Sequence, residues 1–274
     1  MCILVFVTLF PFIYMINVSL SSERYVMQNA VSFLPRGFTL SWYKLVFNDS
    51  RIGIGYRNTI LYTVLGTVIS LTVTSMGAFA LSRPKMIFRR AINLAMVFTI
   101  LFGGGMIPSY LVVKGLGLVD TIWGFILPGI VSTFNILVFR TSFEGLPQDL
   151  FDSGRVDGLQ DLGMFFYIAV PLSKATYAAI GLFVAVGIWN NFYNALLYLR
   201  DSNLFPLQSV LRDLLISGTL ASEASSHAAS RGEVTVLQSL KYATIMVSTL
   251  PILCIYPFLQ KYFVKGVLVG SVKG

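Results

Sequence analysis

Charged residues are scarce in this sequence. Only 12% of the 274 residues are Asp, Glu, Lys or Arg, whereas 55% are hydrophobic. Soluble domains carry about 25% charged residues, and the mean hydropathy of this chain is +0.76. The composition excludes an ordinary soluble domain. It predicts an all-α membrane protein, because lipid satisfies no backbone polar group and helices satisfy their own.

Cysteine and histidine are also nearly absent. Cys2 and Cys254 lie in apolar segments and form neither a disulfide framework nor a metal-binding spacing. The single histidine, His227, has no nearby set of ligands and is typical of a solvated loop. We therefore expect no metal site in this chain.

Catalytic motifs are missing as well. The chain has no GxxxxGK[ST] phosphate loop, no GxSxG, no HExxH and no pair of carboxylates within an apolar stretch. These absences predict a chain that is not an enzyme, binds no cofactor and hydrolyses no ATP by itself. Any energy for uphill transport must then enter through another chain.

Six uncharged stretches remain when the charged residues are marked. Each is long enough, at about 18 residues or more, to span a membrane as a helix. They predict six transmembrane helices in one domain over residues 1–274, and none contains the ionisable group that a proton relay needs. Gly103-Gly104-Gly105 and Pro128 predict kinks or close helix packing. The stretches are 1–22, 58–82, 91–113, 121–139, 175–199 and 242–260.

The distribution of bases predicts the orientation in the membrane. Four bases fall within residues 83–90, and short basic loops favour the cytoplasmic side. We expect 83–90, 140–174 and the C-terminus to be cytoplasmic, and 21–57 and 200–241 to face outward. No base precedes Glu23, and we therefore expect a further segment before residue 1.

One loop concentrates the acidic residues. Residues 144–171 hold five of the twelve acids and a single base, Arg155. Pro147 suits the first turn of a short helix over 148–156, and Gly158 permits a sharp turn after it. A mainly apolar segment over 159–170 follows. The pattern predicts a helix–turn–helix at the membrane face that docks a soluble protein. The five acids are Glu144, Asp149, Asp152, Asp157 and Asp161.

The spacing of this loop resembles the "EAA" loop of permease subunits in binding-protein-dependent ABC importers. That pattern has EAA, three residues, Gly, nine residues and I-x-L-P. Here Asp152-Ser153-Gly154 stands for EAA, Gly158 follows after three residues, and 168–171, Ile-Ala-Val-Pro, follow after nine more. Asp replaces Glu, Ser-Gly replaces Ala-Ala, and Val replaces Leu.

Two further stretches resemble the carbohydrate-importer permeases, in particular the smaller maltose permease subunit. Residues 189–192, Trp-Asn-Asn-Phe, are similar to a WNDF stretch, with Asn191 in place of Asp. Residues 265–274 are similar to that class's GLTAGGVKG terminus, a tail that reaches between the ATP-binding subunits and to which Gly270 and Lys273 belong.

The resemblance implies a type I ABC importer permease fold with a cytoplasmic coupling helix, in the cytoplasmic membrane of a prokaryote. It implies as partners a second, different permease subunit, two ATP-binding subunits that carry ATP and Mg, and an extracytoplasmic solute-binding protein. No nucleic acid is expected, and lipid headgroups are the partners of the excess bases. The resemblance also assigns contacts with the ATP-binding subunit to Asp149, Asp152, Ser153, Gly154, Asp157, Gly158 and Pro171.

Polar and aromatic side chains near the end of the fifth stretch are candidates for the solute path. An uncharged lining of this kind suits a neutral oligosaccharide, although the same residues also form interfacial belts and interhelical hydrogen bonds. On a continuous helix, 190 and 194 share one face and 189 and 193 another. The candidates are Trp189, Asn190, Asn191, Tyr193, Asn194 and, in the fourth stretch, Asn135.

Two alternatives stay open at this point. The chain is an ATP-independent channel or secondary carrier, or it is an ABC importer permease for a solute other than sugar, such as a peptide or amino acid.

Overall fold

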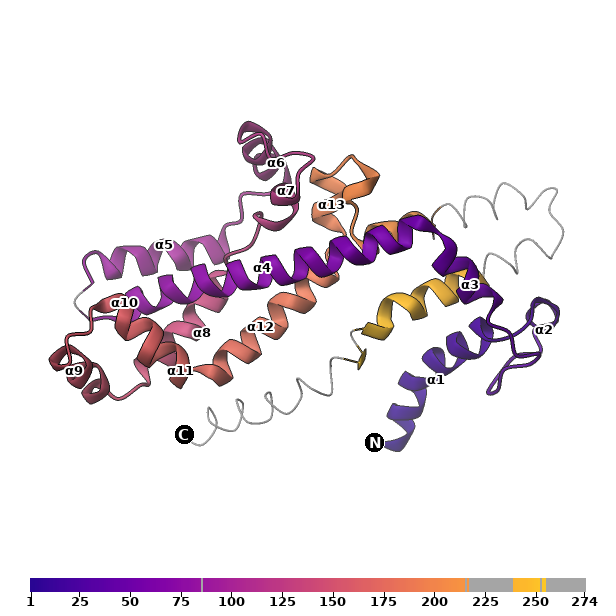
Figure 1. Ribbon diagram of the computed structural model, residues 1–274, viewed down its shortest axis with the longest axis horizontal. Coiled ribbons are helices and arrows are strands. Elements are labelled where there is room, and N and C mark those ends of the chain that lie inside the picture. The colour runs from indigo at the N-terminus through magenta and orange to yellow at the C-terminus, as the bar shows by residue number, and fades with distance from the viewer. Residues whose placement is uncertain (85, 215, 217–238, 252, 255–274) are drawn as a thin grey trace. The chain divides into compact units, whose positions relative to one another are not determined.

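The computed structural model describes residues 1–84, 86–214, 216, 239–251, 253 and 254. These residues are helical, with one isolated β-bridge between Ser21 and Phe38 and no strand in the described part of the chain. The chain divides into two compact units, and the long helix α4 (Ser50–Ser82) begins in the first and continues in the second. Each unit is described separately below (Figure 1).

The first unit holds residues 1–59 and the described residues from 200 to 254. Residues 207–214 and 239–251 are also helical in this unit. Its other complete elements are α1 (Cys2–Ser19), α2 (Glu23–Met27), α3 (Ser41–Asn48) and the 3₁₀-helix η2 (Ser202–Leu204).

Hydrogen bonds from buried polar side chains hold the first unit together. The Trp42 Nε1–H donates to the Ser21 carbonyl oxygen at 3.0 Å. At the start of α4, the Asn58 amide donates to the Asn203 carbonyl oxygen at 2.7 Å. The Thr59 hydroxyl accepts from the Leu207 N–H at 2.7 Å. These bonds tie segments that are distant in sequence, and they satisfy backbone groups that would otherwise be buried without partners.

The described part of the second unit is residues 60–84 and 86–199. It contains the rest of α4 and a series of shorter helices, and α8 packs against both α5 and α12. The elements are α5 (Arg89–Leu101), α6 (Met106–Gly115), α7 (Ile122–Ile126), α8 (Thr133–Glu144), α9 (Gln148–Val156), α10 (Asp161–Met164), the π-helix η1 (Phe165–Ala169), α11 (Val170–Leu172), α12 (Lys174–Trp189) and α13 (Tyr193–Tyr198).

An aromatic core lies at one end of this unit. Figure 1 shows α9, α10 and α11 gathered beside the C-terminal end of α4. Each fully buried Phe side chain contributes roughly 1.5–3 kcal/mol of apolar burial, so this end is held by side-chain packing. The buried residues of the core are Ala78, Phe79, Phe139, Phe143, Phe151, Met164, Phe165, Ala169 and Ile180.

The predicted membrane spans match the helices unevenly. Helix α4 is the one described helix that is long and apolar enough to cross a membrane alone. Two bent pairs of helices are also long and apolar enough to cross a membrane if each pair is one span. These are α5 with α6, bent by 118°, and 161–172 with α12, bent by 83°. The 242–260 stretch lies partly outside the described residues. The count of six spans therefore stays a prediction.

Three of the predicted continuous spans are interrupted. The 91–113 stretch breaks after Leu101 at the glycine triplet, where Gly105 has φ +79°. The 121–139 stretch breaks between α7 and α8 around Pro128, and the 175–199 stretch breaks after Trp189. Glycine at positive φ and proline both favour a helix break, so the kinks predicted at the glycine triplet and at Pro128 are present, and the span ranges stay a prediction.

Candidate functional site

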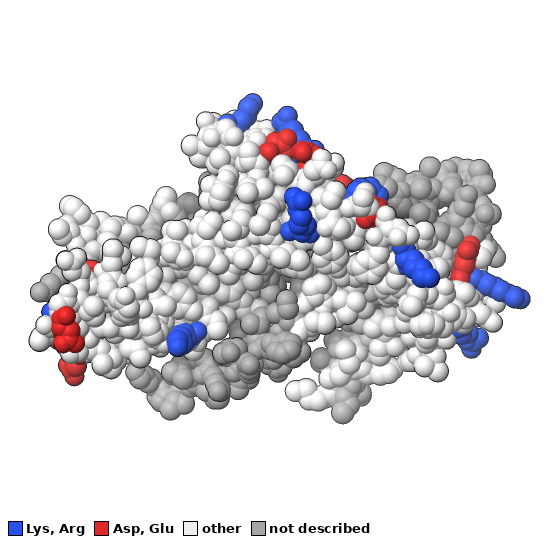
Figure 2. Space-filling view, in the orientation of Figure 1, with Lys and Arg blue, Asp and Glu red and all other residues white. Residues whose placement is uncertain are grey.

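Residues 145–172, here called the elbow, form the first candidate site. Helix α9 covers the predicted range of 148–156 and exposes most of its polar residues, with Phe151 and Gly154 buried beneath. Asp149 lies in its first turn and Arg155 in its last, which is the favourable placement for the helix dipole. Figure 2 shows acidic side chains over α9. The elbow thus offers an exposed acidic helix on an apolar base.

A Schellman turn ends α9. Gly158 has φ +84°, and its N–H donates to the Arg155 carbonyl oxygen at 3.0 Å. The Leu159 N–H donates to the Gly154 carbonyl oxygen at 2.8 Å. These are the paired bonds of this C-terminal cap, in which glycine takes the left-handed position. The turn reverses the chain immediately after the acidic helix.

Gly154 lets the returning chain approach α9 closely. A Cβ atom at this position would lie 2.9 Å from Ile168 Cδ1 and 3.3 Å from Leu159 Cδ1. Both atoms are the ends of flexible side chains, which pack closely against the backbone of Gly154. The two arms of the elbow therefore pack directly on each other.

Arg83 connects the end of α4 to α9. Its guanidinium carbon lies 4.2 Å from the centre of the Phe79 ring and 3.7 Å from the centre of the Phe151 ring. Each cation–π contact of this kind contributes about 0.5–2 kcal/mol. Burial lowers the pKa of Arg83, and the nearby positive charge of Arg155 lowers it further, while Asp161 raises it. A movement of α9 would pull directly on the end of α4.

An ionic cluster fixes the entry to the elbow. The Glu144 carboxylate accepts from Arg140 Nε at 2.9 Å and also pairs with Arg89. Arg89 Nε donates to the Leu81 carbonyl oxygen at 2.9 Å, and Arg140 Nη1 donates to the Asn93 side chain at 2.9 Å. These bonds join the ends of α4, α5 and α8. Glu144, one of the five acids of the loop, is thus paired with arginines of the same chain.

The elbow leads into α12 through an irregular helix. Residues 165–169 form a π-helix, and Pro171 lies in the short α11 just before the 83° bend at Ser173. π-helical turns are rare and are frequent at functional sites. Pro171 thus precedes the bend, and α12 begins at Lys174.

The second candidate site is a cavity of about 240 Å³, here called the asparagine cavity. Its lining brings together three of the predicted solute-path residues, Asn135, Asn191 and Asn194, from different elements. The Asn194 amide donates to the carbonyl oxygens of Phe125 at 3.0 Å and Pro128 at 3.3 Å. The remaining lining residues are Ser70, Phe125, Ile126, Pro128, Gly129, Ile130, Phe183, Val184, Gly187 and Ile188.

Three other predicted path residues lie outside the lining of this cavity. Trp189 is buried, Asn190 donates its side-chain amide to the Val186 carbonyl oxygen at 3.0 Å, and Tyr193 is half-exposed. The expected sharing of helix faces by residues 190 and 194 is wrong. α12 ends at Trp189 and α13 begins at Tyr193, so no continuous helix relates these positions. The Asn191 side chain instead accepts from the Asn194 N–H at 3.0 Å and caps the new helix.

Some predictions lie outside the described residues. Gly270, Lys273 and His227 belong to this group. Within the described ranges, no three His, Cys, Asp or Glu side chains gather as a metal would require.

Comparisons with known proteins place these features in a family. No family model matches the chain. The chain is 43% identical over 268 residues to Protein LplC of Bacillus subtilis, covering 98% of this chain and 90% of that protein. It is 40% identical over 264 residues to the polygalacturonan/rhamnogalacturonan transport system permease protein YtcP of Bacillus subtilis, covering 96% and 92%. A solved bacterial ABC transporter, involved in the import of the acidic polysaccharide alginate, has a chain that matches with a TM-score of 0.85 at 34% identity, covering 95% and 92%.

The chain belongs to the permease subunits of ABC transport systems. The predicted family is confirmed, and its permeases are membrane proteins that are not themselves enzymes. The all-helical architecture of the described residues agrees with the matched importer structure. The alternative of a channel or secondary carrier is thereby set aside.

The most prominent residue in contact with the elbow that the sequence did not indicate is Arg83. In the sequence it is only one of the four bases within residues 83–90. The signal in the sequence for Arg83 was its position directly after an apolar helix. The other bases of that segment indicate the orientation of the chain in the membrane. Its stacking on Phe151 depends on a contact distant in sequence, which no local pattern carries.

Proposed function

We propose that this permease forms half of the membrane pore of an ATP-driven importer that moves an oligosaccharide across the cytoplasmic membrane by alternating access. A second, different permease subunit forms the other half. Two ATP-binding subunits bind and hydrolyse ATP with Mg, and an extracytoplasmic solute-binding protein delivers the solute. The observation that carries the proposal is an exposed acidic helix braced on a membrane helix, in a chain of this family.

The elbow is the surface that transmits the ATP-driven motion. Asp149, Asp152 and Ser153 lie on α9 and are exposed to a partner, whereas Gly154 is buried and, with the turn at Gly158, sets the shape of the elbow. Asp157 precedes that turn, and Pro171 precedes the bend into α12. Closure of the ATP-binding subunits would move the elbow as a rigid body, and Arg83 and the aromatic core would pass that movement to α4. In this arrangement 83–90 and the elbow are cytoplasmic, as is the C-terminus, and the chain crosses the membrane six times.

A carbohydrate solute is supported by the relatives and by the asparagine cavity. YtcP is by name a polygalacturonan/rhamnogalacturonan transport system permease protein, and the matched ABC transporter is involved in the import of alginate. The cavity combines amide groups with the Phe125 and Phe183 rings, and none of its described lining residues is charged. Amides and aromatic rings suit sugar hydroxyls and sugar faces. The cavity itself supplies no charge that would select an acidic sugar.

Reconstitution of the complete importer tests the proposal. The chain is co-purified with the products of its neighbouring transport genes, placed in liposomes, and assayed for ATP hydrolysis with the solute-binding protein. Neutral oligosaccharides, acidic oligosaccharides and a peptide mixture are compared. We expect hydrolysis to rise with an oligosaccharide. A rise with the peptides alone would overturn the solute class, and the absence of any ATP-binding partner would overturn the importer.

A charge reversal tests the docking surface. Asp152→Lys places a cation on the exposed face of α9, and we expect about a tenfold loss of uptake, as for one lost charge-assisted contact. Asp213→Lys is the matched control, since Asp213 is also exposed but lies in the segment expected to face outward. Equal uptake by both variants would remove α9 from the coupling surface.

A further inference from the structure

A cavity of about 550 Å³ lies between the end of α4 and the elbow. The Nε and Nη2 atoms of Arg83 are buried and have no hydrogen-bond partner among the described residues. The two stacked rings cover the flat faces of the guanidinium, and the N–H groups of Nε and Nη2 have no acceptor among the described residues. A buried charged donor without an acceptor is costly, so the arrangement calls for an anionic acceptor.

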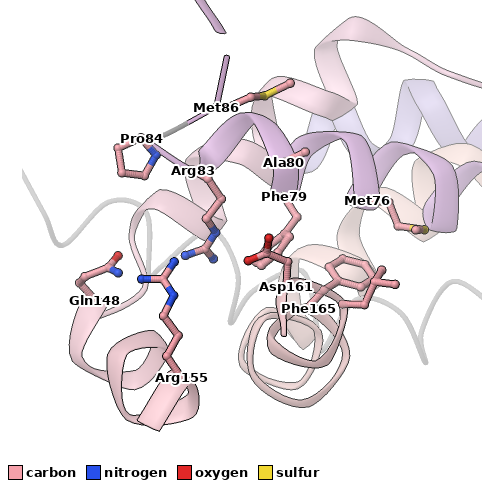
Figure 3. Close-up of a pocket in the computed structure, with 11 residues that line it drawn as sticks. Met76, Phe79, Ala80, Arg83, Pro84, Met86, Gln148, Arg155, Asp161 and Phe165 are labelled. Carbon is pink, nitrogen blue, oxygen red and sulfur yellow. The ribbon is translucent and has the colours of Figure 1, made fainter. Parts of the chain in front are cut away.

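A second cation faces the same cavity. Figure 3 shows the Arg155 side chain rising from α9 toward the Arg83 guanidinium, with Gln148 beside it and Asp161 across from them. Arg155 makes one long contact with Asp152, at 3.4 Å. Asp161 is not among the ion pairs found between described residues, so it leaves both guanidinium groups available. An anion between two facing guanidinium groups relieves their repulsion and accepts from both.

The other walls of the cavity are apolar. Met76, Phe79 and Ala80 come from α4, and Leu162 and Phe165 come from the returning arm of the elbow. The cavity therefore has a cationic end and an apolar side, at the point where a membrane-spanning helix ends. This is the chemistry of an anionic lipid, whose phosphate and acyl chain require the two kinds of surface together.

The position of the cavity on α9 favours a lipid over a carboxylate of the ATP-binding subunit. Gln148 and Arg155, which line it, are one heptad apart on the helix. Asp149 and Val156 follow each of them by one position and so point about 100° around the helix. A docking protein would meet the face of Val156, which is 88% exposed, whereas a lipid can place one acyl chain along the apolar wall between α4 and the elbow.

We propose that Arg83 and Arg155 bind the headgroup phosphate of an anionic phospholipid, with one acyl chain along the apolar wall of Met76, Ala80 and Phe165. The proposal rests on the proposed placement of the elbow at the cytoplasmic membrane face. The bound lipid would brace the elbow against α4 and make coupling depend on the lipid composition of the membrane.

Native mass spectrometry of the assembled importer tests this site directly. The complex is exchanged into mixed micelles that contain phosphatidylglycerol or phosphatidylcholine, and retained lipid is counted. We expect retention of phosphatidylglycerol by the wild type and about tenfold weaker retention by Arg83→Gln and by Arg155→Gln, as for one lost charge-assisted hydrogen bond. Arg83→Lys should restore part of it. Arg90→Gln, an exposed base of the same segment, is the matched control and should retain lipid normally.

The outcomes separate this site from the proposed function. Equal phosphatidylglycerol retention by the wild type and both glutamine variants would overturn the lipid site, even if solute-stimulated ATP hydrolysis is normal. A cross-link from position 155 to an ATP-binding subunit, with no lipid retained by the assembled importer, would assign the cavity to the partner protein instead. Displacement by inorganic phosphate at equal concentration would show that the acyl chain contributes nothing. Lipid retention without solute-stimulated hydrolysis would support the site and count against the importer.

Discussion

The elbow and the asparagine cavity are built by opposite means. In the elbow, aromatic side chains and a stacked arginine hold short helices together, and a Cβ atom added at Gly154 or Gly163 would meet side-chain atoms. Around the cavity, helices are interrupted, and the gaps are held by side chains that bond to backbone carbonyl groups, such as Asn194 to Phe125 and Ser70 to Ile130. Transmission of force requires stiff packing, whereas a solute path requires polar groups at a cavity wall, where the interrupted helices place Asn191 and Asn194.

The largest expected effect is in the aromatic core of the elbow. Phe151→Ala removes a fully buried ring on which Arg83 stacks and which lies 6.2 Å from the Phe79 ring. We expect the free energy of unfolding to fall by about 3–5 kcal/mol. We also expect ATP hydrolysis that no longer responds to solute. Thermal denaturation and proteolysis of the elbow measure the loss of stability, with Tyr167→Ala as the exposed control. Unchanged resistance to proteolysis would show that the elbow does not depend on this packing.

The backbone near the cavity is tested by Gly124→Ala. A Cβ atom there would lie 2.2 Å from the Leu118 carbonyl oxygen, which is backbone and cannot rotate away. We expect a destabilisation of about 1–3 kcal/mol from overpacking, read as a lower denaturation temperature. The control is Gly115→Ala, whose Cβ would meet no atom within 4 Å. Equal stability of the two variants would contradict a cavity region held by backbone contacts.

Gly158 tests the turn of the elbow. Gly158→Ala at φ +84° should cost about 1–2 kcal/mol, the penalty of an L-residue in the left-handed region. Gly158→Pro also removes the N–H that donates to Arg155 and should abolish ATP-coupled uptake while membrane insertion stays intact. Gly145→Ala is the control, since its φ is −78°. Normal uptake by the proline variant would count heavily against a rigid elbow.

The smallest effect is expected at Gly154. In Gly154→Ala, displacement of the Ile168 and Leu159 side-chain ends should cost about 0.5–1.5 kcal/mol, and the better helix propensity of Ala returns about 1 kcal/mol. Stability and uptake should therefore stay close to those of the wild type. A loss as large as that of Phe151→Ala would show that the elbow tolerates no added volume and would weaken the contrast with Gly124.

The elbow was predictable from sequence because its signals are local. Pro147, Gly158 and the alternation of acidic and apolar residues specify a short helix and its turn without reference to the rest of the chain. The asparagine cavity was only partly predictable. The break after Trp189 depends on the Asn191 cap and on bonds from Asn194 to α7 and the segment after it, and a window over 175–199 shows only uncharged residues. Three of the predicted polar residues, Asn135, Asn191 and Asn194, line one cavity, whereas the assignment of 190 and 194 to one helix face was wrong.

The π-helix between α10 and α11 fixes the direction of the arm that follows it. A π-helical turn contains one residue more than an α-helical turn, so every side chain after it is rotated by about 100° from its α-helical position. Ile168, which packs over Gly154, and the start of α12 both take their orientation from this extra residue. A single deletion between Asp161 and Pro171 would leave α9 and α12 unchanged in sequence and yet turn one relative to the other. The orientation of α9 relative to α12 is therefore set by the number of residues between them.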